Sequence, residues 1–171
     1  MGCDAYLFDI DGTLLRTHDL VHYSALNRAM REVYGKNTTI DGVQYHGMTD
    51  PGILRAALAR AGVSAAEFEG KLPEALAAVC QDVEENVSRF EPLVCEAIPA
   101  VLEELRTTGK LLGVASGNLE SVGWHKIKAA GLREFFNFGV FSDHHEARPQ
   151  IFARGVALVK ERLGPNPACV S

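Results

Sequence analysis

The spacing of the hydrophobic residues changes twice along the chain. Residues 5–10 form a short continuous apolar run whose length and aromatic content are typical of a buried strand. Between residues 19 and 92 the apolar positions recur at intervals of three and four, which indicates helices. After residue 92 short apolar runs alternate with helical stretches. The pattern predicts one strand, then a helical segment, then alternating helices and strands.

Two helices are indicated in the first part of the helical segment. The first carries an apolar stripe at helical spacing from Tyr23 to Val33, and Gly35 is a suitable residue to end it. Asp50 and Pro51 have the residue types of an N-cap and a first helical position. We therefore predict a second helix with Asp50 as its N-cap.

A further helical stretch follows the glycine that closes this second helix, Gly62. Ser64 and Glu67 have the spacing of a capping box, which predicts a helix start at this point. Gly70 and Pro73 are expected to interrupt that stretch, because both residues are unfavourable inside a helix. Apolar residues at helical spacing then resume after the proline.

The last part of the chain alternates between the two periodicities. Helices are predicted at 99–108, 119–130 and 149–163, with strands at 110–115 and 136–141 and another strand beginning at 168. Strands that alternate with helices imply a parallel sheet with right-handed crossovers. We therefore expect an α/β core formed by residues 1–17 and 93–171, with a helical insertion at 18–92.

Composition and charge narrow the class of protein. Of the 171 residues 47% are hydrophobic and 23% charged, which is enough apolar material for a folded core. The net charge of −5, with dispersed Lys and Arg, gives no electrostatic footprint for nucleic acid. No apolar run approaches the ~20 residues of a membrane helix, and no secretory signal opens the chain. The four cysteines contain no C-x-x-C pair, so we expect a cytoplasmic protein with reduced thiols.

Polar residues follow three of the predicted strands. They are Asp9 with Asp11, the segment 116–118, and the segment 143–148. In an open parallel sheet, ligands bind at the carboxyl ends of the strands. We therefore expect these three segments, which are far apart in sequence, to meet at one edge of the sheet.

Asp9 and Asp11 are the strongest candidates for chemistry. Two carboxylates at the end of one strand can reach a common space, where they repel each other unless Mg²⁺ or a shared proton is present. In the chemical interpretation Asp9 attacks a phosphorus atom, and Asp11 protonates the leaving oxygen and then deprotonates water. The alternative interpretation of this segment is a solvated turn.

These residues also carry a family resemblance. The segment 8–15, FDIDGTLL, resembles the first motif of the haloacid dehalogenase-like (HAD) superfamily. Residues 115–118 are similar to its second motif, and residues 47–51 with the helices around them are similar to its helical cap. The stretch 113–132 resembles phosphoglycolate-phosphatase-like members of the superfamily. The resemblance covers nearly the whole chain.

The resemblance implies a fold and an activity. The fold would be a HAD-type Rossmann-like parallel sheet with an inserted all-helical cap. The activity would be Mg²⁺-dependent hydrolysis of a small phosphorylated metabolite through an aspartyl-phosphate intermediate, with Asp9 and Asp11 as metal ligands. A sugar-phosphate mutase of the same superfamily and a catalytically impaired binding module are the alternatives.

The resemblance also implies roles for residues after the later strands. Ser116, Gly117 and Asn118 would bind a phosphoryl oxygen through the serine hydroxyl and free backbone N–H groups at a helix N-terminus. The simpler interpretation of these three residues is a helix cap. Arg148 stands where the family has a cation, usually lysine, that binds the phosphoryl group. Asp143 follows a strand and could lie near the site, with no role assigned.

Five histidines complete the candidates. His18, His22 and His46 are expected as possible contacts in the cleft between cap and core, whereas the adjacent His144 and His145 are expected at the surface.

The family's fourth motif, Gly-Asp with a further Asp, would complete the Mg²⁺ site. It follows the next strand, and the sequence ends at Ser171, where that motif should begin. We therefore expect this chain to be a fragment or a reduced relative, in which Asp9 and Asp11 alone bind Mg²⁺ weakly.

Overall fold

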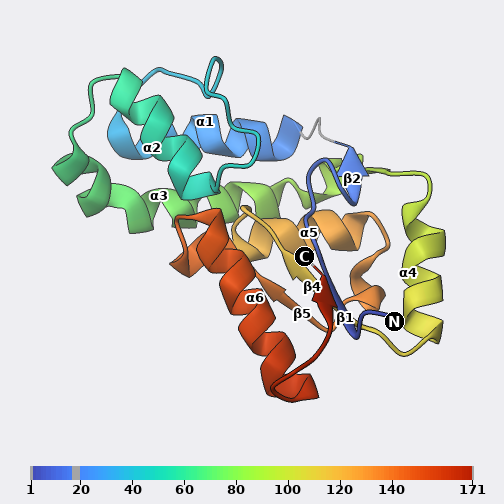
Figure 1. Ribbon diagram of the computed structural model, residues 1–171. Helices are drawn as coiled ribbons and strands as arrows, with labels where there is room; N and C mark the ends of the chain where they lie inside the picture. Colours follow the sequence, from blue (N-terminus) through green and yellow to red (C-terminus); the bar gives the residue numbers. More distant parts are fainter. Residues whose placement is uncertain (1, 17–19, 171) are drawn as a thin grey trace.

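Four strands form the central sheet of the computed structural model, which describes residues 2–16 and 20–170. The strands are β1 (Ala5–Phe8), β4 (Leu111–Ala115), β5 (Phe138–Val140) and β6 (Cys169–Val170). They lie in the order β5-β4-β1-β6, and every neighbouring pair is parallel (Figure 1). The predicted α/β class with a parallel sheet is therefore confirmed.

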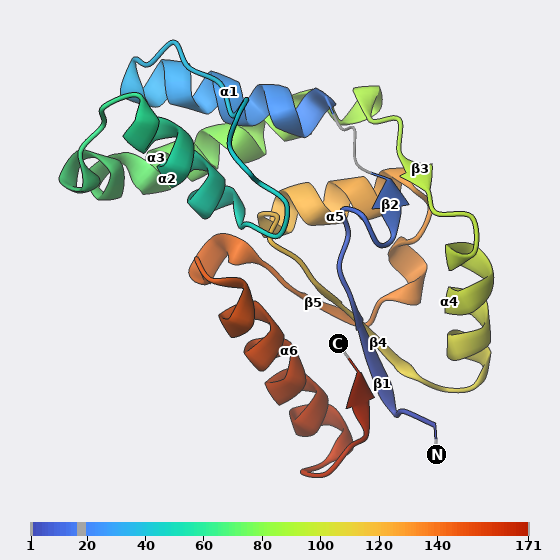
Figure 2. The same cartoon turned by 45° about the horizontal axis from the view of Figure 1, so that its top comes forward.

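Helices cover both faces of this sheet. They are α4 (Ile98–Thr107), α5 (Glu120–Ala129) and α6 (Arg148–Leu163). Leu102 of α4 and Ile127 of α5 belong to one buried cluster, whereas Ile151 and Val159 of α6 pack in a second cluster with Leu7 of β1. Because successive strand residues point to opposite faces, these clusters form two layers, with α6 opposite α4 and α5 (Figure 2).

Three helices form a unit of their own at one end of the sheet. They are α1 (Leu20–Tyr34), α2 (Asp50–Arg60) and α3 (Ala65–Glu85), and residues 20–85 are called the helical unit below. Leu26, Leu54 and Val79 lie in its buried core, which Leu119 and Val122 of the α5 region join. The helical unit therefore packs on α5, beyond the carboxyl ends of the strands (Figure 2).

A short antiparallel pair, which the sequence did not predict, lies where the chain leaves and re-enters the core. Its strands are β2 (Leu15–Arg16) and β3 (Leu93–Val94). Single-turn 3₁₀ segments occur at Val87–Arg89, Arg133–Phe135 and Ser142–His144. The pair links the two crossings between the α/β part and the helical unit by backbone hydrogen bonds.

The structure corrects three local predictions. The N-cap of α2 is Thr49, whose side chain accepts the Gly52 N–H, so Asp50 is the first helical residue instead. Helix α3 runs continuously through Pro73, because its buried face, which includes Phe68 and Val79, outweighs the hydrogen bond that proline removes. The first strand ends at residue 8 and not at residue 10. The predicted N-cap at Ser64 is confirmed by its hydrogen bond from the Glu67 N–H.

None of the helices in the described ranges is both long enough and apolar enough to cross a membrane.

Candidate active site

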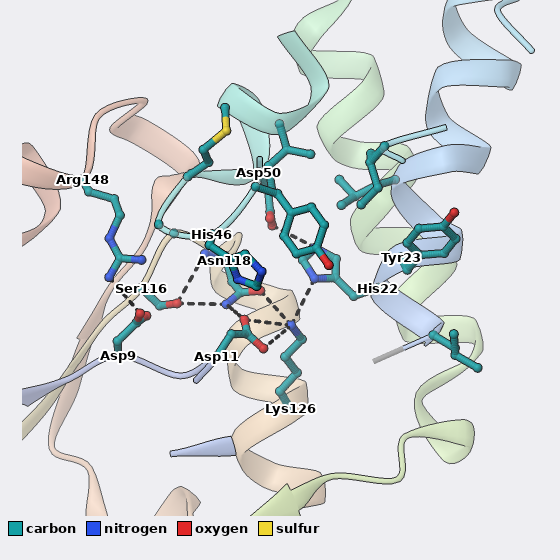
Figure 3. Close-up of a pocket in the computed structure, with 18 residues that line it drawn as sticks. Asp9, Asp11, His22, Tyr23, His46, Asp50, Ser116, Asn118, Lys126 and Arg148 are labelled. Carbon is teal, nitrogen blue, oxygen red and sulfur yellow. Dashed lines mark hydrogen bonds and ion pairs between the residues drawn. The ribbon is translucent and has the colours of Figure 1, made fainter. Parts of the chain in front are cut away.

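A cavity of about 350 Å³ lies between the helical unit and the carboxyl ends of β1 and β4 (Figure 3). All six candidate residues for catalysis and substrate binding line it, namely Asp9, Asp11, Ser116, Gly117, Asn118 and Arg148. Lys126 of α5 also lines it, and the helical unit contributes Leu20, His22, Tyr23, Leu26, Ile40, Tyr45, His46, Gly47, Met48, Asp50 and Ile53. The fold thus brings the three strand-end segments together, as the sheet topology predicts.

Asp9 follows β1 directly and is held by the core alone. Nη2 of Arg148 donates to its Oδ2 at 2.8 Å, and the Ile10 N–H donates to its Oδ1 at 2.9 Å. The Asp9 and Arg148 side chains are 20% and 23% exposed. Arg148 is the first residue of α6, so the N-terminus of this helix places a cation beside the carboxylate of Asp9. Both oxygens of Asp9 are therefore oriented before any ligand binds.

Asp11 has a different set of partners. Nδ2 of Asn118 donates to its Oδ2 at 2.7 Å, and Nζ of Lys126 lies 3.0 Å from both of its oxygens. Desolvation raises the pKa of Asp11, but the Lys126 charge and the Asn118 hydrogen bond together outweigh it and lower the pKa below 3.8. This carboxyl group is consequently ionised at neutral pH.

Lys126 continues a buried polar chain from the core into the helical unit. Its Nζ lies 3.0 Å from Oδ1 of Asn118 and 3.1 Å from Nδ1 of His22, and His22 Nε2 lies 3.1 Å from Oδ2 of Asp50. An ammonium group can only donate, so Nδ1 of His22 accepts. The proton of a neutral His22 ring is then on Nε2 and is donated to Asp50.

The Ser116–Asn118 loop is ordered by its own side chains and by the helical unit. Oγ of Ser116 accepts from Nδ2 of Asn118 at 2.9 Å, which leaves the serine hydroxyl inside the cavity beside Asp9 (Figure 3). The expected free N–H groups at the start of α5 are partly occupied. The Leu119 N–H donates to Asp50 and the Glu120 N–H to Asp143, at 2.8 and 2.7 Å. Carboxylates therefore already stabilise this helix N-terminus.

The start of α2 is docked against the core beside the cavity. The Asp50 N–H donates to the Gly117 carbonyl at 2.8 Å, and the Thr49 hydroxyl donates to the Glu146 carbonyl at 2.7 Å. A Cβ atom at Gly117 would clash with the backbone of Met48, so glycine permits this close approach. Arg55 forms an ion pair with the Glu146 carboxylate, which lowers the pKa of Glu146.

The remaining candidates from the sequence are Asp143 and the histidines, and only two of the described ones line the cavity. Asp143 is exposed and caps α5, so it does not reach the cavity. His22 and His46 line the cavity, whereas His144 is exposed and His145 half-buried outside it. His18 lies outside the described residues.

Two functional candidates were missed by the reasoning from sequence. Lys126 was not singled out, although it lies on the buried face of α5 with Val122 and Ile127. A lysine on an otherwise apolar helical stripe is rarely buried unless it is paired, and this was the available signal. The residue type of Asp50 predicts an N-cap, and nothing in the sequence indicates its contacts with His22 and the Leu119 N–H.

Solved structures with the same fold are known. The match with CbbY from Rhodobacter sphaeroides in complex with phosphate has 21% identity and a TM-score of 0.69, and covers 99% of this chain and 76% of that one. The match with β-phosphoglucomutase from Clostridium difficile has 19% identity and a TM-score of 0.67, and covers 98% of this chain and 74% of that one. The match with a predicted phosphoglycolate phosphatase from Haemophilus somnus 129pt has 16% identity and a TM-score of 0.60, and covers 91% of this chain and 72% of that one. At these identities the likeness establishes the fold.

The sequence itself establishes the family. No curated protein matches it. Residues 6–165, however, match the family described as haloacid dehalogenase-like hydrolase, and this range includes every residue that lines the cavity. The match confirms the resemblance seen in the motifs: the chain belongs to the haloacid dehalogenase-like hydrolases.

Proposed function

We propose that this chain is a phosphomonoester hydrolase that acts on a small phosphorylated metabolite through an aspartyl-phosphate intermediate. The observation that supports this most is the placement of Asp9 and Asp11 in one cavity with Ser116 and Arg148 beside them (Figure 3). A nucleophile, a proton-transfer group and donors for a phosphoryl group are the parts that the reaction needs.

In the first step Asp9 is the nucleophile. A carboxylate oxygen of Asp9 attacks phosphorus, and the bond from phosphorus to the ester oxygen breaks. Arg148 can then contact both Asp9 and the phosphoryl oxygens, since a guanidinium group offers five N–H donors. The Ser116 hydroxyl lines the same end of the cavity and can donate to another phosphoryl oxygen.

In both steps Asp11 transfers the proton. It gives a proton to the departing alkoxide, and the resulting carboxylate takes one from the water that attacks the aspartyl-phosphate. The lowered pKa of Asp11 favours the carboxylate that the second step needs. For the first step a phosphate dianion beside Asp11 adds negative charge, which raises the pKa of this carboxyl group.

The donor set fits Mg²⁺ in part. Mg²⁺ usually takes one or two protein carboxylates together with substrate phosphate and water, and Asp9 and Asp11 would supply the carboxylates. Asp50 faces His22 and the Leu119 N–H instead. No group of three or more His, Cys, Asp or Glu side chains in the described ranges is placed to hold a metal. A bound ion would neutralise the transferred phosphoryl group.

We further propose that the helical unit, within residues 18–92, acts as a cap over a core formed by residues 1–17 and 93–171. The cavity of about 350 Å³ is at the small end of the range for ligand sites. A substrate enclosed between cap and core would be shielded from water. This arrangement favours small phosphorylated metabolites over phosphorylated proteins.

A phosphomutase is the second candidate, because one structure with the same fold is a β-phosphoglucomutase. The two activities differ in their products. A hydrolase releases inorganic phosphate, whereas a mutase returns an isomer of the phosphorylated substrate with no net release of phosphate.

The Asp9→Asn variant tests the proposal. We expect release of phosphate from 4-nitrophenyl phosphate to fall by at least about 10³-fold, because the amide cannot form the acyl phosphate. Hydroxylamine should trap an acyl phosphate during turnover by the unmodified chain and not by the variant. Asp143→Asn is the matched control, since it makes the same change outside the cavity and keeps an oxygen that can cap α5. Equal activity in the two variants would contradict the assignment.

A further inference from the structure

The two ends of the cavity differ in chemistry. Asp9, Ser116 and Arg148 lie at one end, where the reaction is proposed to occur (Figure 3). The helical unit lines the opposite part of the cavity with the polar residues His22, His46 and Asp50 and with six aliphatic or aromatic side chains, which are called the apolar end below. These six are Leu20, Tyr23, Leu26, Ile40, Tyr45 and Ile53. The leaving group of a bound phosphate ester would occupy this second end.

The polar group of Tyr23 is already engaged outside this end. Its hydroxyl lies 2.9 Å from both carboxylate oxygens of Asp41, and Asp41 does not line the cavity. Tyr23 therefore presents its ring to a ligand and commits its hydroxyl elsewhere. The carboxylate of Asp50 is also engaged, because this residue is 2% exposed and accepts from His22 and from the Leu119 N–H.

The charges of the lining residues do not provide for a second anion. Among the described residues that line the cavity, three are aspartates, Asp9, Asp11 and Asp50, and two are cations, Lys126 and Arg148. Each cation contacts an aspartate: Lys126 contacts Asp11 and Arg148 contacts Asp9. With histidines neutral, the lining has one negative charge in excess. The five residues outside the described ranges include no Lys or Arg.

A second anionic group at the apolar end would therefore gain no Lys or Arg partner from the described lining. An anion that is even partly desolvated without such a partner is destabilised, and the nearby aspartates add repulsion. An uncharged apolar group would instead gain from contact with the aliphatic and aromatic lining. The difference should be visible in binding as well as in turnover.

We infer that the substrate is a phosphate monoester with an uncharged, largely apolar leaving group, and not a bisphosphate or a phosphorylated carboxylic acid. This inference rests on the proposed function, because it assumes that the phosphoryl group sits at Asp9. It also disfavours the mutase, since exchange of a phosphoryl group between two positions passes through a bisphosphate that needs an anion site at each end of the cavity.

Two phosphonates of the same shape test the inference without turnover. 4-Methylphenylphosphonate and 4-carboxyphenylphosphonate differ only in the group at the far end, and neither can be hydrolysed. Calorimetry on the full chain should show the methyl compound binding at least about tenfold more tightly. Equal binding, tighter binding of the carboxylate, or binding of neither compound would overturn the inference.

A pair of variants tests whether the far group occupies the apolar end. Tyr45 lines this end and is 42% exposed, so Tyr45→Arg adds a cation there at little risk to folding. We expect the preference for the methyl compound to fall to about threefold or less. Val101→Arg is the matched control, because Val101 is also 42% exposed but belongs to α4, away from the cavity. An unchanged preference in Tyr45→Arg would sink the inference.

Turnover separates this inference from the proposed function. Phenyl phosphate has an uncharged apolar leaving group, and release of phosphate from it reports hydrolysis. If the phosphonate preference is found and no phosphate is released, the preference for an uncharged apolar ligand stands and the hydrolase proposal fails. If phosphate is released but the phosphonates bind equally, the hydrolase stands and the substrate class is wrong.

Discussion

Asp9 and Asp11 are two residues apart and line one cavity, yet they belong to different parts of the molecule. Asp9 is held by the Ile10 N–H and by Arg148, so its hydrogen bonds within the described part of the chain come from the α/β part. Asp11 is held by Asn118 and Lys126, and through Lys126 it is connected to His22 of the helical unit.

This difference separates the two proposed chemical roles. Within the described ranges, no hydrogen bond of Asp9 comes from the helical unit. The ionisation of Asp11, in contrast, depends on this unit, because the charge of Lys126 lowers its pKa, and Lys126 is connected through His22 to Asp50 of α2. We therefore expect changes at the contact between the helical unit and the core to affect proton transfer by Asp11 more than nucleophilic attack by Asp9.

The largest loss of activity that distinguishes the two aspartates is expected from Asp11→Asn. Loss of acid–base help should lower kcat/KM for an alkyl phosphate by about 10²–10⁴-fold. The loss should be smaller for 4-nitrophenyl phosphate, because that leaving group departs without a proton. Steady-state release of phosphate from both substrates measures the ratio, and thermal unfolding checks that the variant is folded.

Asp9→Asn provides the reference for that ratio. A nucleophile is needed whatever the leaving group, so this variant should lose activity equally on both substrates. If Asp11→Asn also lost activity equally on the two, Asp11 would not act as the acid.

Lys126→Met should reverse the pKa shift of Asp11. Desolvation alone raises the pKa of Asp11, and the lysine charge is the largest influence that lowers it. In the unmodified chain, this carboxylate adds stability above its ordinary value of 3.8 and loses the contribution as the pH falls through the lower folded-state value. In Lys126→Met the Asn118 hydrogen bond remains, but we expect desolvation to outweigh it and to raise the folded-state pKa above the ordinary one, so that stability falls as the pH rises between the two.

Two measurements check this reversal. A carboxyl NMR titration should place Asp11 above its ordinary pKa in Lys126→Met, and urea unfolding should show a loss of about 2 kcal/mol at neutral pH. That figure is below the usual cost of breaking a buried pair, because Asp11 is 32% exposed. Lys128→Met is the matched control, since Lys128 is exposed on the same helix. A titration unchanged from that control would show that Lys126 does not set the charge of Asp11.

The part of the site built on the sheet was predictable, because parallel topology alone brings strand ends to one edge. This topology predicts that Asp9, Asp11 and Ser116 lie together, and all three line the cavity. The contacts that cross from the helical unit were not predictable. Asp50 has the residue type of an N-cap, and only the docking of α2 shows that Thr49 caps the helix while Asp50 faces His22.

Local propensity failed where tertiary packing was stronger. Pro73 and Gly70 disfavour a helix, but α3 is long and buries one face against α1 and α2, so the helix continues. The β2–β3 pair was missed for a related reason. Strands of two residues have no detectable periodicity, and they form only because the two crossings lie side by side.

The smallest expected effect comes from Arg55→Gln, which weakens the docking of α2 at a distance from both aspartates. The Arg55 side chain is 34% exposed and pairs with Glu146 of the core, so its loss should cost at most about 1 kcal/mol. That energy corresponds to a change of about two- to fivefold in kcat/KM if docking is coupled to the reaction. Because Asp11 is the carboxylate connected to α2, the carboxyl NMR signal of Asp11 should shift and that of Asp9 should not.

Arg106→Gln breaks a similar exposed pair within α4, with Glu103, and should move neither signal. If both aspartate signals moved together in Arg55→Gln, the two carboxylates would respond to α2 as one group, and the distinction drawn between them would be lost.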